Sequence, residues 1–378
     1  SNICTASALM ASMVGFYCIY NGAEGLKRAA LTAHLAAASV AKALTAMDYR
    51  LANTSFFDTL EVEAEASVIQ SLALEHGINF HYPSDERVHM SFDEVTTPEE
   101  VETVVAIFAE AKGRKAKSAK MVSEPEIAPS LQRRSEILTE PVFNRYRCES
   151  DLMRYIKRLE LRDISLANSM ISLGSCTMKL NAAALMQPLS LAGFQNIHPF
   201  APADQTEGYT ELIGELEHDL ATITGFAACT LQPNSGAAGE YTGLMVIRAY
   251  HQSRGQGYRN IILIPASAHG TNPASAAMAG MKIVTVACDA EGNIDVEDLK
   301  KKAQEYSSEL CGLMVTYPST HGIFESRIRE IIDAVHDAGG QVYMDGANMN
   351  AQVGLTNPGY IGADVCHLNL HKTFAMPH

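Results

Sequence analysis

Helix and strand patterns alternate regularly from Tyr209 onward, and this alternation is the strongest constraint on the fold. Most of the predicted strands are joined to the next through a helix, which favours a mostly parallel sheet with helices on both faces. The predicted helices cover 211–222, 236–253, 296–306 and 328–338, with a short one from Pro273, and the predicted strands cover 227–231, 260–264, 282–287, 313–316, 341–344 and 365–368. Ligands of such sheets bind beyond the carboxyl ends of the strands, so the residues after each strand are candidates for a site.

The first part of the chain mixes helices and strands without strict alternation, which is typical of a small α+β domain. Its predicted helices cover 1–23 (buried), 26–47, 68–76 and 99–111, and its predicted strands cover 55–62, 78–82 and 88–92. Lys, Ser, Pro, Glu and Arg dominate 112–134, so we expect a linker there, followed by a helix over 149–160. The expected parts are therefore a small domain over 1–111, a linker and lead-in helix over 112–165, and a large domain over 166–378.

Composition and charge exclude several classes of protein. The 378 residues include 29 basic and 43 acidic side chains, and the net charge of -14 argues against a general nucleic-acid or anionic-membrane binder. The first 23 residues carry no charge, but Ser, Thr, Asn and Gly dilute their apolar residues and no basic region precedes them, so neither a membrane span nor a signal peptide is expected. The eight cysteines are scattered without a CxxC pair, which predicts no metal site and a reducing compartment.

The first candidate for catalysis is Lys372, in the string VCHLNLHKTF from Val365. It follows a short apolar strand and lies between His371 and Thr373. Partial desolvation of such a lysine disfavours the ammonium and frees the amine to form a Schiff base with a carbonyl cofactor. The alternative is a charge at a strand end that reaches water.

Two further candidates follow the first two predicted strands of the large domain. The small-residue turn from Asn234 to Glu240 enters a long helix, so its amides and the Ser235 hydroxyl suit a phosphate; the alternative is a helix cap with close packing. In the string ASAHGTNPA, the imidazole of His269 is placed to lie over an aromatic cofactor. The alternative is a polar side chain satisfied by its neighbours.

Three other segments carry polar groups suited to a ligand. Asp345 ends a predicted buried strand and requires a cation, which could be a pyridinium nitrogen, a metal ion or an arginine. The string TYPSTHG, which includes Thr320, supplies hydroxyls at another strand end. The Gly-Ser-Cys-Thr turn within 170–181 could bring backbone amides near a ligand or simply reverse the chain.

The order of these candidates is more specific than any single member. A phosphate turn at Ser235, then His269, Thr320 and Asp345, and finally Lys372 resembles the aspartate-aminotransferase-like superfamily of pyridoxal 5'-phosphate (PLP) enzymes. The resemblance implies an α/β fold of the PLP-dependent transferase type (fold type I), with a mostly parallel large domain preceded by a small α+β domain.

Longer strings resemble one family within that superfamily, glycine decarboxylase, the P-protein of the glycine cleavage system. They are GSCTMKLNAAA from Gly174, NIHPFAPADQTEGY from Asn196, QPNSGAAGEY from Gln232, SAHGTNPASA from Ser267, TYPSTHG from Thr316, GGQVYMDGANMNAQVG from Gly339 and HLNLHKTF from His367. The chain departs from the family pattern at Leu185, Ala238 and Ala277. Because Ala238 lies in the phosphate turn, it removes a side chain that could hydrogen-bond there.

The resemblance implies an oxidoreductase that decarboxylates glycine with PLP and passes the aminomethyl group to the lipoyl arm of the H-protein carrier. Its implied catalytic residues are Lys372, His269 and Asp345, and no metal is implied. The residues implied to bind the cofactor are Ser235, Gly236, Ala237, His269, Thr320, Asp345, Asn348, His371 and Lys372. A homodimer is implied, in the bacterial cytoplasm or the mitochondrial matrix of a eukaryote.

The family's pattern continues past His378, so the chain is expected to be a truncated part of such a protein. Under this expectation, the small domain over 1–111 is the end of an N-terminal PLP-fold half, and the large domain belongs to the C-terminal half. Two alternatives stay open at this point. One is another PLP enzyme of fold type I, such as an amino-acid decarboxylase or a desulfurase, and the other is an inactive fragment.

Overall fold

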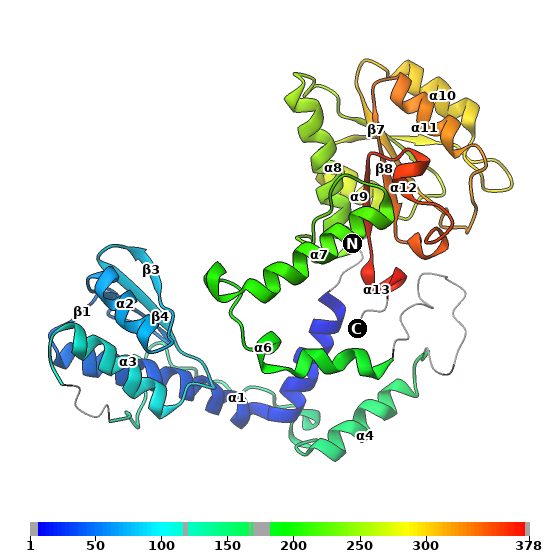
Figure 1. Cartoon of the computed structure of the whole chain (residues 1–378). Coiled ribbons are helices and arrows are strands. Elements are labelled where there is room, and N and C mark those ends of the chain that lie inside the picture. Colours follow the sequence, from blue (N-terminus) through cyan, green and yellow to red (C-terminus); the bar gives the residue numbers. More distant parts are fainter. Residues whose placement is uncertain (1–6, 116–119, 166–167, 169–181, 375–378) are drawn as a thin grey trace. The chain divides into compact units, whose positions relative to one another are not determined.

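The computed structural model describes residues 7–115, 120–165, 168 and 182–374. Its contacts divide the chain into two compact units, one of Ser12–Leu159 and one of Glu160–His378 with Ser1–Ala11 (Figure 1). The first unit therefore includes residues 112–159 as well as residues 12–111 of the predicted small domain. The three-part division predicted from the sequence stays a prediction, and the predicted turn within 170–181 lies outside the described residues.

The first unit begins with helix α1 (Ser7–Ala46), which is two helices joined at a kink. At the kink, Gly22 has φ +60°, and the Arg147 guanidinium and the Phe143 carbonyl fill the space where a side chain would stand. The predicted pair of helices is therefore confirmed. Within the described residues, the stretch Met10–Ala46 is long and apolar enough to cross a bilayer, although half of its most apolar window is buried inside the structure.

The prediction that the first of these helices is buried is wrong. Met10, Met13 and Val14 are each more than half exposed. The buried part of α1 is the second helix, where Ala37, Val40 and other small or branched residues face the core. The small residues pack closely in the second helix only, because that helix alone has a sheet and helices against it.

A four-stranded antiparallel sheet covers the second half of α1 in the part of the unit that the structure describes. Its strands follow the order β1 (Arg50–Leu51), β2 (Thr59–Glu63), β4 (Arg87–Ser91) and β3 (His81–Ser84). Helices α2 (Ala66–Glu75) and α3 (Pro98–Ala111) complete the layer, and Thr97 and Glu100 form a capping box at the start of α3. The predicted strand over 78–82 is largely wrong, since β3 begins at His81, whereas helix α4 (Glu149–Glu160) is confirmed.

The second unit is built on a parallel sheet, which has five strands among the described residues. The order is β6 (Lys282–Val286), β5 (Ile261–Pro265), β7 (Leu310–Thr316), β8 (Gln341–Gly346) and β9 (Val365–Leu368). Helix α8 (Gly236–Ser253) precedes the first of these strands in the chain, and the helices between strands include α9 (Thr271–Met278), α10 (Val296–Glu305) and α11 (Ile328–Asp337). This arrangement confirms the predicted α/β fold.

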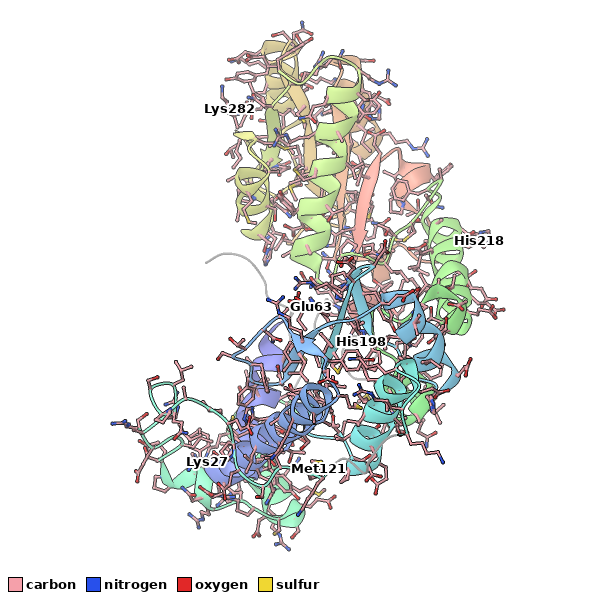
Figure 2. All side chains as sticks on the ribbon, turned by 90° about the vertical axis from the view of Figure 1, so that its left-hand side faces the viewer. Lys27, Glu63, Met121, His198, His218 and Lys282 are labelled. Atoms are coloured by element: carbon pink, nitrogen blue, oxygen red, sulfur yellow. The ribbon has the colours of Figure 1, made fainter. Side chains whose placement is uncertain are left out.

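Helices cover both faces of this sheet. Val342 of β8 packs in a cluster with side chains of α10 and α11, whereas the next residue, Tyr343, packs with Leu244 and Ile247 of α8. Successive residues of a strand point to opposite faces, so α8 and α10 lie on opposite sides (Figure 1). The edge strand β6 is largely exposed, and Lys282 at its start lies on the outside of the unit (Figure 2).

One predicted strand of the large domain is wrong. Residues 227–231, all of which the structure describes, form no strand, and the Leu231 amide donates to the Glu217 carboxylate at 3.0 Å instead of to a ladder. The segment has only short side chains before Leu231, so it gains little from packing on a sheet.

The remaining elements connect these layers. They are α6 (Ala192–Gln195), α7 (Glu207–Thr224), α12 (Pro358–Ile361), α13 (Leu370–Thr373) and the 3-10 helices η1 (Pro141–Asn144), η2 (Ala183–Ser190), η3 (Ala203–Gln205) and η4 (Met349–Ala351). Helix α13 follows β9 directly and contains Lys372.

Candidate active site

Three buried polar side chains lie side by side at the carboxyl ends of β7, β8 and β9. In the sheet register, Thr316 stands opposite Asp345, and Asp345 stands opposite His367. All three are less than a tenth exposed. The strand ends are the place where ligands of open α/β sheets bind, so this row is the centre of the candidate site.

Hydrogen-bond donors surround the carboxylate of Asp345. Its Oδ2 accepts from Nδ2 of Asn272 at 3.0 Å, and its Oδ1 accepts from the amide of Ala347 at 2.9 Å. Nε2 of His367 lies 3.5 Å from the same Oδ1. Donors on both oxygens hold a buried carboxyl group in one orientation, so the site fixes the position of Asp345.

His367 is held from its other side by Tyr343. The Tyr343 hydroxyl and Nδ1 of His367 are hydrogen-bonded, and the two rings are stacked with their planes at 21°. Burial lowers the pKa of His367, partly offset by the charge of Asp345, and burial raises the pKa of Tyr343 well above its usual value. The hydroxyl therefore donates to Nδ1 of a neutral imidazole, which leaves the hydrogen on Nε2 for Asp345.

A second buried carboxyl group, Glu240, lies in the second turn of α8. Its Oε2 accepts from the Ser275 hydroxyl at 2.6 Å and its Oε1 from Nδ2 of Asn272 at 3.4 Å. Burial raises the pKa of Glu240 to about 7; the charge of Asp345 acts in the same direction, and the bonds from Ser275 and Asn272 oppose it. Glu240 therefore gains or loses its proton near neutral pH.

The ligand-type atoms of Glu240, Asp345 and His367 all lie within 4.8 Å of one another. A metal ion is one group that such a set could hold. In this structure, protein groups already contact both carboxyl groups, and Tyr343 is hydrogen-bonded to Nδ1 of the imidazole. The set is therefore best described as a buried hydrogen-bond network.

Lys372 lies in α13, next to this network. Its side chain is partly buried, and its charge lowers the pKa of both Glu240 and His367. Asn369, which is buried, precedes α13, and its Oδ1 would lie 2.6 Å from a Cβ at Gly236. The amino-terminal end of α8 therefore packs directly against the segment that leads to the lysine.

The structure places the remaining predicted site residues around this centre. Ser235 is the N-cap of α8, where its hydroxyl accepts from the Ala238 amide at 3.1 Å, and Gly236 and Ala237 form the first turn of that helix. This is the helix cap that the sequence left open as an alternative, and it sets the amino-terminal end of an 18-residue helix at the site.

Of the other predicted residues, His269 and Asn348 form hydrogen bonds with groups other than Asp345. His269 is exposed, and its Nδ1 accepts from the Thr271 amide at 3.1 Å. Nδ2 of Asn348 donates to the Pro318 carbonyl at 3.1 Å. Thr320 is half-buried in the loop after β7, and His371 is half-buried beside Lys372 in α13. Their predicted roles with a cofactor stay predictions.

The sequence did not single out the partners that connect the network, namely Glu240, Asn272, Ser275, Tyr343 and His367. Signals for some of them exist in the sequence. Glu240 is a lone acid among small and apolar residues of α8, and Tyr343 lies two residues before Asp345 and therefore on the same face of its strand. No signal identifies Asn272, because its role depends on three elements that only the fold brings together.

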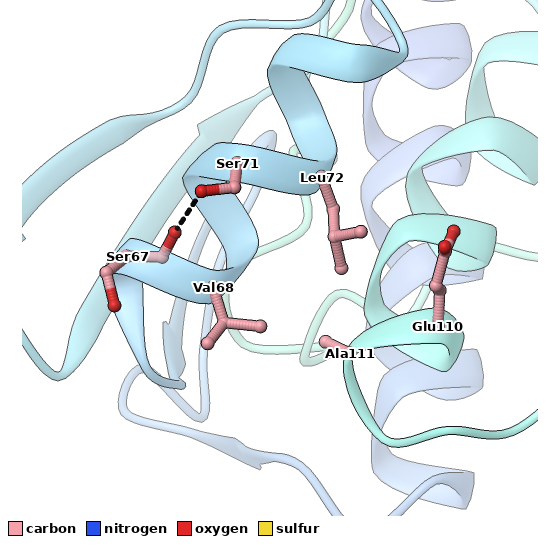
Figure 3. Close-up of a pocket in the computed structure, with 6 residues that line it drawn as sticks. All are labelled: Ser67, Val68, Ser71, Leu72, Glu110 and Ala111. Atoms are coloured by element: carbon pink, nitrogen blue, oxygen red, sulfur yellow. Dashed lines mark hydrogen bonds between the residues drawn. The ribbon is translucent and has the colours of Figure 1, made fainter.

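A shallow pocket lies in the other unit, between α2 and α3 (Figure 3). Its lining residues are Ser67, Val68, Ser71, Leu72, Glu110 and Ala111, and the Ser71 hydroxyl donates to the Ser67 carbonyl at 3.0 Å. The pocket has a single charged side chain and an exposed position on the helix pair. It therefore offers no set of converging polar groups comparable to the network around Asp345.

The parallel sheet with an acid, a lysine and a helix amino terminus at its carboxyl end defines the class: the fold is that of PLP-dependent transferases of fold type I. The same fold is found in the crystal structure of a glycine decarboxylase (P-protein) of the glycine cleavage system, in inhibitor-bound form. The TM-score is 0.52 at 16% sequence identity, and the match covers 64% of this chain and 51% of that chain. The predicted fold class is thereby confirmed.

Sequence comparison finds similar proteins. Residues 1–108 match the family model described as "Glycine cleavage system P-protein". The chain is 57% identical over 379 aligned positions to the glycine dehydrogenase (decarboxylating) of Christiangramia forsetii, and 58% identical to that of Flavobacterium johnsoniae. Each match covers 100% of this chain and 40% of the relative, so the chain spans about two fifths of their length. The chain is therefore similar over its whole length to part of these enzymes, which confirms the resemblance of its motifs.

Proposed function

We propose that this chain is part of a glycine decarboxylase that uses PLP. The observation that carries the proposal is the placement of Asp345 and Lys372 after neighbouring parallel strands, on the fold of PLP-dependent transferases and beside the amino-terminal end of α8. The names of the relatives, glycine dehydrogenase (decarboxylating), support the choice of substrate. On the same ground we propose a lipoylated H-protein as partner, a homodimer as assembly and the bacterial cytoplasm as location.

The residues at the carboxyl end of the sheet fit PLP by their chemistry. The buried Asp345 accepts neutral donors on both oxygens and can still receive the hydrogen of a protonated ring nitrogen. Lys372, partly buried in α13, is the amine that would bind the cofactor's carbonyl carbon. The first turn of α8 at Gly236 and Ala237 offers a helix amino terminus to a phosphate group.

Bound PLP supplies an electron sink for the charge left when carbon dioxide departs. The chain's own part in the reaction is to hold and orient. Asp345 keeps a hydrogen on the ring nitrogen, and the buried donors around it keep that carboxylate in one position. His269 and Thr320, in loops that follow β5 and β7, are proposed to face the cofactor ring, and Asn348 and His371 are proposed to line its edge.

The experiment compares PLP uptake by the wild-type chain, the Lys372→Ala variant and the matched Lys282→Ala variant, whose lysine lies at the exposed start of β6. Lys372→Ala is expected to lose the visible absorbance of bound PLP and the adduct that borohydride reduces, whereas Lys282→Ala keeps both. A reducible adduct in Lys372→Ala contradicts the assignment.

A second measurement separates the proposed reaction from its alternatives. Exchange of labelled bicarbonate into glycine in the presence of H-protein is the expected activity of the longer protein. PLP uptake with release of carbon dioxide from another amino acid, or of sulfur from cysteine, would indicate a different enzyme of this fold. PLP uptake without exchange in the longer protein would indicate an inactive member.

A further inference from the structure

Glu240 is a buried acid for which the proposed reaction has no role. It is 5% exposed, and its two oxygens contact Ser275 and Asn272 of α9. Unlike Asp345, it receives no hydrogen bond from a backbone amide in the contacts that the described residues provide. Ionising a buried carboxyl group that lacks strong donors costs free energy. We therefore expect Glu240 to act in its neutral form.

Asn272 connects Glu240 to Asp345. Its amide nitrogen carries two hydrogens; one points to Oδ2 of Asp345 at 3.0 Å and the other to Oε1 of Glu240 at 3.4 Å. Its oxygen accepts from the Thr316 hydroxyl at 3.2 Å. Both hydrogens of this amide are engaged and its oxygen is held by Thr316, so a change at Glu240 is transmitted to the group that holds Asp345.

We propose that Glu240 is a positioning residue that is protonated in the folded protein and, through Asn272, orients the Asp345 carboxylate toward the cofactor. This inference rests on the proposed function, because Asp345 needs a fixed charge only when a cationic ring nitrogen binds it. Two carboxyl groups that share one buried site do not both ionise readily.

The choice between the two carboxyl groups follows from their donors. Asp345 accepts from the Ala347 amide and from Asn272, and His367 adds a third donor at 3.5 Å. Glu240 has its shortest contact with the Ser275 hydroxyl, which can accept a hydrogen as well as donate one. A protonated Glu240 can therefore donate its hydrogen to the Ser275 hydroxyl and keep that contact. A hydrogen on Asp345 would instead point at groups that are themselves donors.

The charged and titratable groups around Glu240 agree with this assignment. Burial, and then the Asp345 charge, raise the pKa of Glu240 to about 7, and Lys372 from α13 opposes this shift. On β8, burial keeps Tyr343 neutral by raising its pKa, and on β9 burial lowers the pKa of His367. Asp345 and Lys372 are therefore the charges that act on Glu240.

The first test needs no cofactor. Infrared spectroscopy of the cofactor-free chain resolves the carbonyl band of a protonated carboxyl group, which is followed as the pH is raised. The wild-type chain is expected to lose one such band near neutral pH, and Glu240→Gln is expected to lack that transition. Glu325→Gln is the matched control, because Glu325 is buried in the same unit and accepts from the Ile294 amide.

Two further variants report whether Glu240 is coupled to Asp345. Asp345→Asn removes a neighbouring negative charge and should lower the midpoint of the Glu240 transition. Ser275→Ala removes a hydrogen bond to the anion and should raise it. Opposite shifts support the proposal. A wild-type spectrum without the transition, a transition that persists in Glu240→Gln, or a midpoint that neither variant moves would overturn it.

The second test uses PLP as the probe. Glu240→Ala should bind PLP about tenfold more weakly than the wild-type chain, because Asn272 loses one of its partners. Glu240→Gln resembles the neutral acid, so it should bind PLP as tightly as the wild type does below the midpoint of the Glu240 transition. Above that midpoint the affinity of the wild type should change with pH, whereas the affinity of Glu240→Gln should change less. Glu325→Gln should bind as the wild type does. Equal affinity in Glu240→Ala overturns the positioning role.

The two tests fail independently. If the wild-type chain takes up no PLP while the infrared transition and its two shifts are found, the proposed function fails for this chain and the carboxyl coupling stands. If PLP binds and Glu240→Ala leaves its affinity unchanged, the proposed function stands and the role of Glu240 fails.

Discussion

The Tyr343 hydroxyl donates a hydrogen bond to Nδ1 of His367, and both side chains are buried beneath the end of the sheet. The two residues come from neighbouring parallel strands, β8 and β9. Because burial raises the pKa of Tyr343, its hydroxyl keeps its hydrogen at neutral pH. The pair therefore fixes which ring nitrogen of His367 faces Asp345.

We expect Tyr343→Phe to leave Nδ1 of His367 without its donor and to destabilise the second unit by about 1 to 3 kcal/mol, the cost of an unsatisfied buried polar group. Denaturant unfolding measures the change. Nitrogen NMR of the His367 ring should show a mixture of tautomers in place of one. Tyr360→Phe is the control, because the Tyr360 side chain is largely exposed. A single unchanged tautomer in Tyr343→Phe would contradict the assignment.

We expect Gly236→Ala to displace Asn369, because the new Cβ would lie 2.6 Å from its Oδ1. Since Asn369 precedes α13, the lysine should move with it, and uptake of PLP should fall while helix content is unchanged. Absorbance of bound PLP and circular dichroism are the two measurements.

Gly214→Ala in α7 is the matched control for this substitution. Nothing lies within 4 Å of a Cβ at that position, so the change should raise stability by about 1 kcal/mol through helix propensity alone. Equal loss of PLP uptake in both variants would show that the contact with Asn369 is not the cause.

The stability of the second unit should depend on pH through Glu240. The folded-state pKa of about 7 lies above the ordinary value of 4.5, so the folded state binds more protons between these two values. The free energy of unfolding therefore falls as pH rises from about 4.5 to 7, by roughly 3 kcal/mol in total at about 1.4 kcal/mol per pH unit. Denaturant unfolding over this range should show a smaller fall for Glu240→Gln. Identical dependence of the unfolding free energy on pH in the wild type and in Glu240→Gln would contradict the role of Glu240.

The thiols should differ in their reactivity toward iodoacetamide. Burial raises the pKa of Cys311 to about 11 and raises that of Cys366 as well, so neither provides much thiolate. Cys148 is exposed and should react before Cys311 and Cys366 in the native protein. Mass spectrometry of peptides from briefly treated protein checks the order. Denatured protein, in which all three should react at similar rates, is the control.

Elements with long, regular patterns could be predicted from the sequence. Helices α4 and α8 and strand β9 agree with their predicted bounds, since helical periodicity and apolar runs mark them clearly. The strand at 227–231 and the burial of the first helix could not be predicted correctly. Both depend on whether a packing partner exists, which local composition does not reveal.

The candidate site was predictable where a residue follows a strand. Asp345 and Lys372 were found in this way, and the structure brings Asp345 into a buried row with Thr316 and His367. The network partners could not be predicted in this way, because Glu240 and Asn272 come from different helices. Side chains separated by 73 residues in sequence, as Asn272 and Asp345 are, become neighbours only in the folded sheet.

Three glycines of α8 face the strands that carry the site. A Cβ at Gly236 would meet Asn369, one at Gly239 would lie 3.0 Å from Cβ of His367, and one at Gly243 would lie 2.6 Å from the Tyr343 ring. Their spacing of three and four residues places them on one side of the helix. A larger residue at any of these positions therefore requires a compensating change in the segment that it faces. We expect the helix and the strands to change together during evolution.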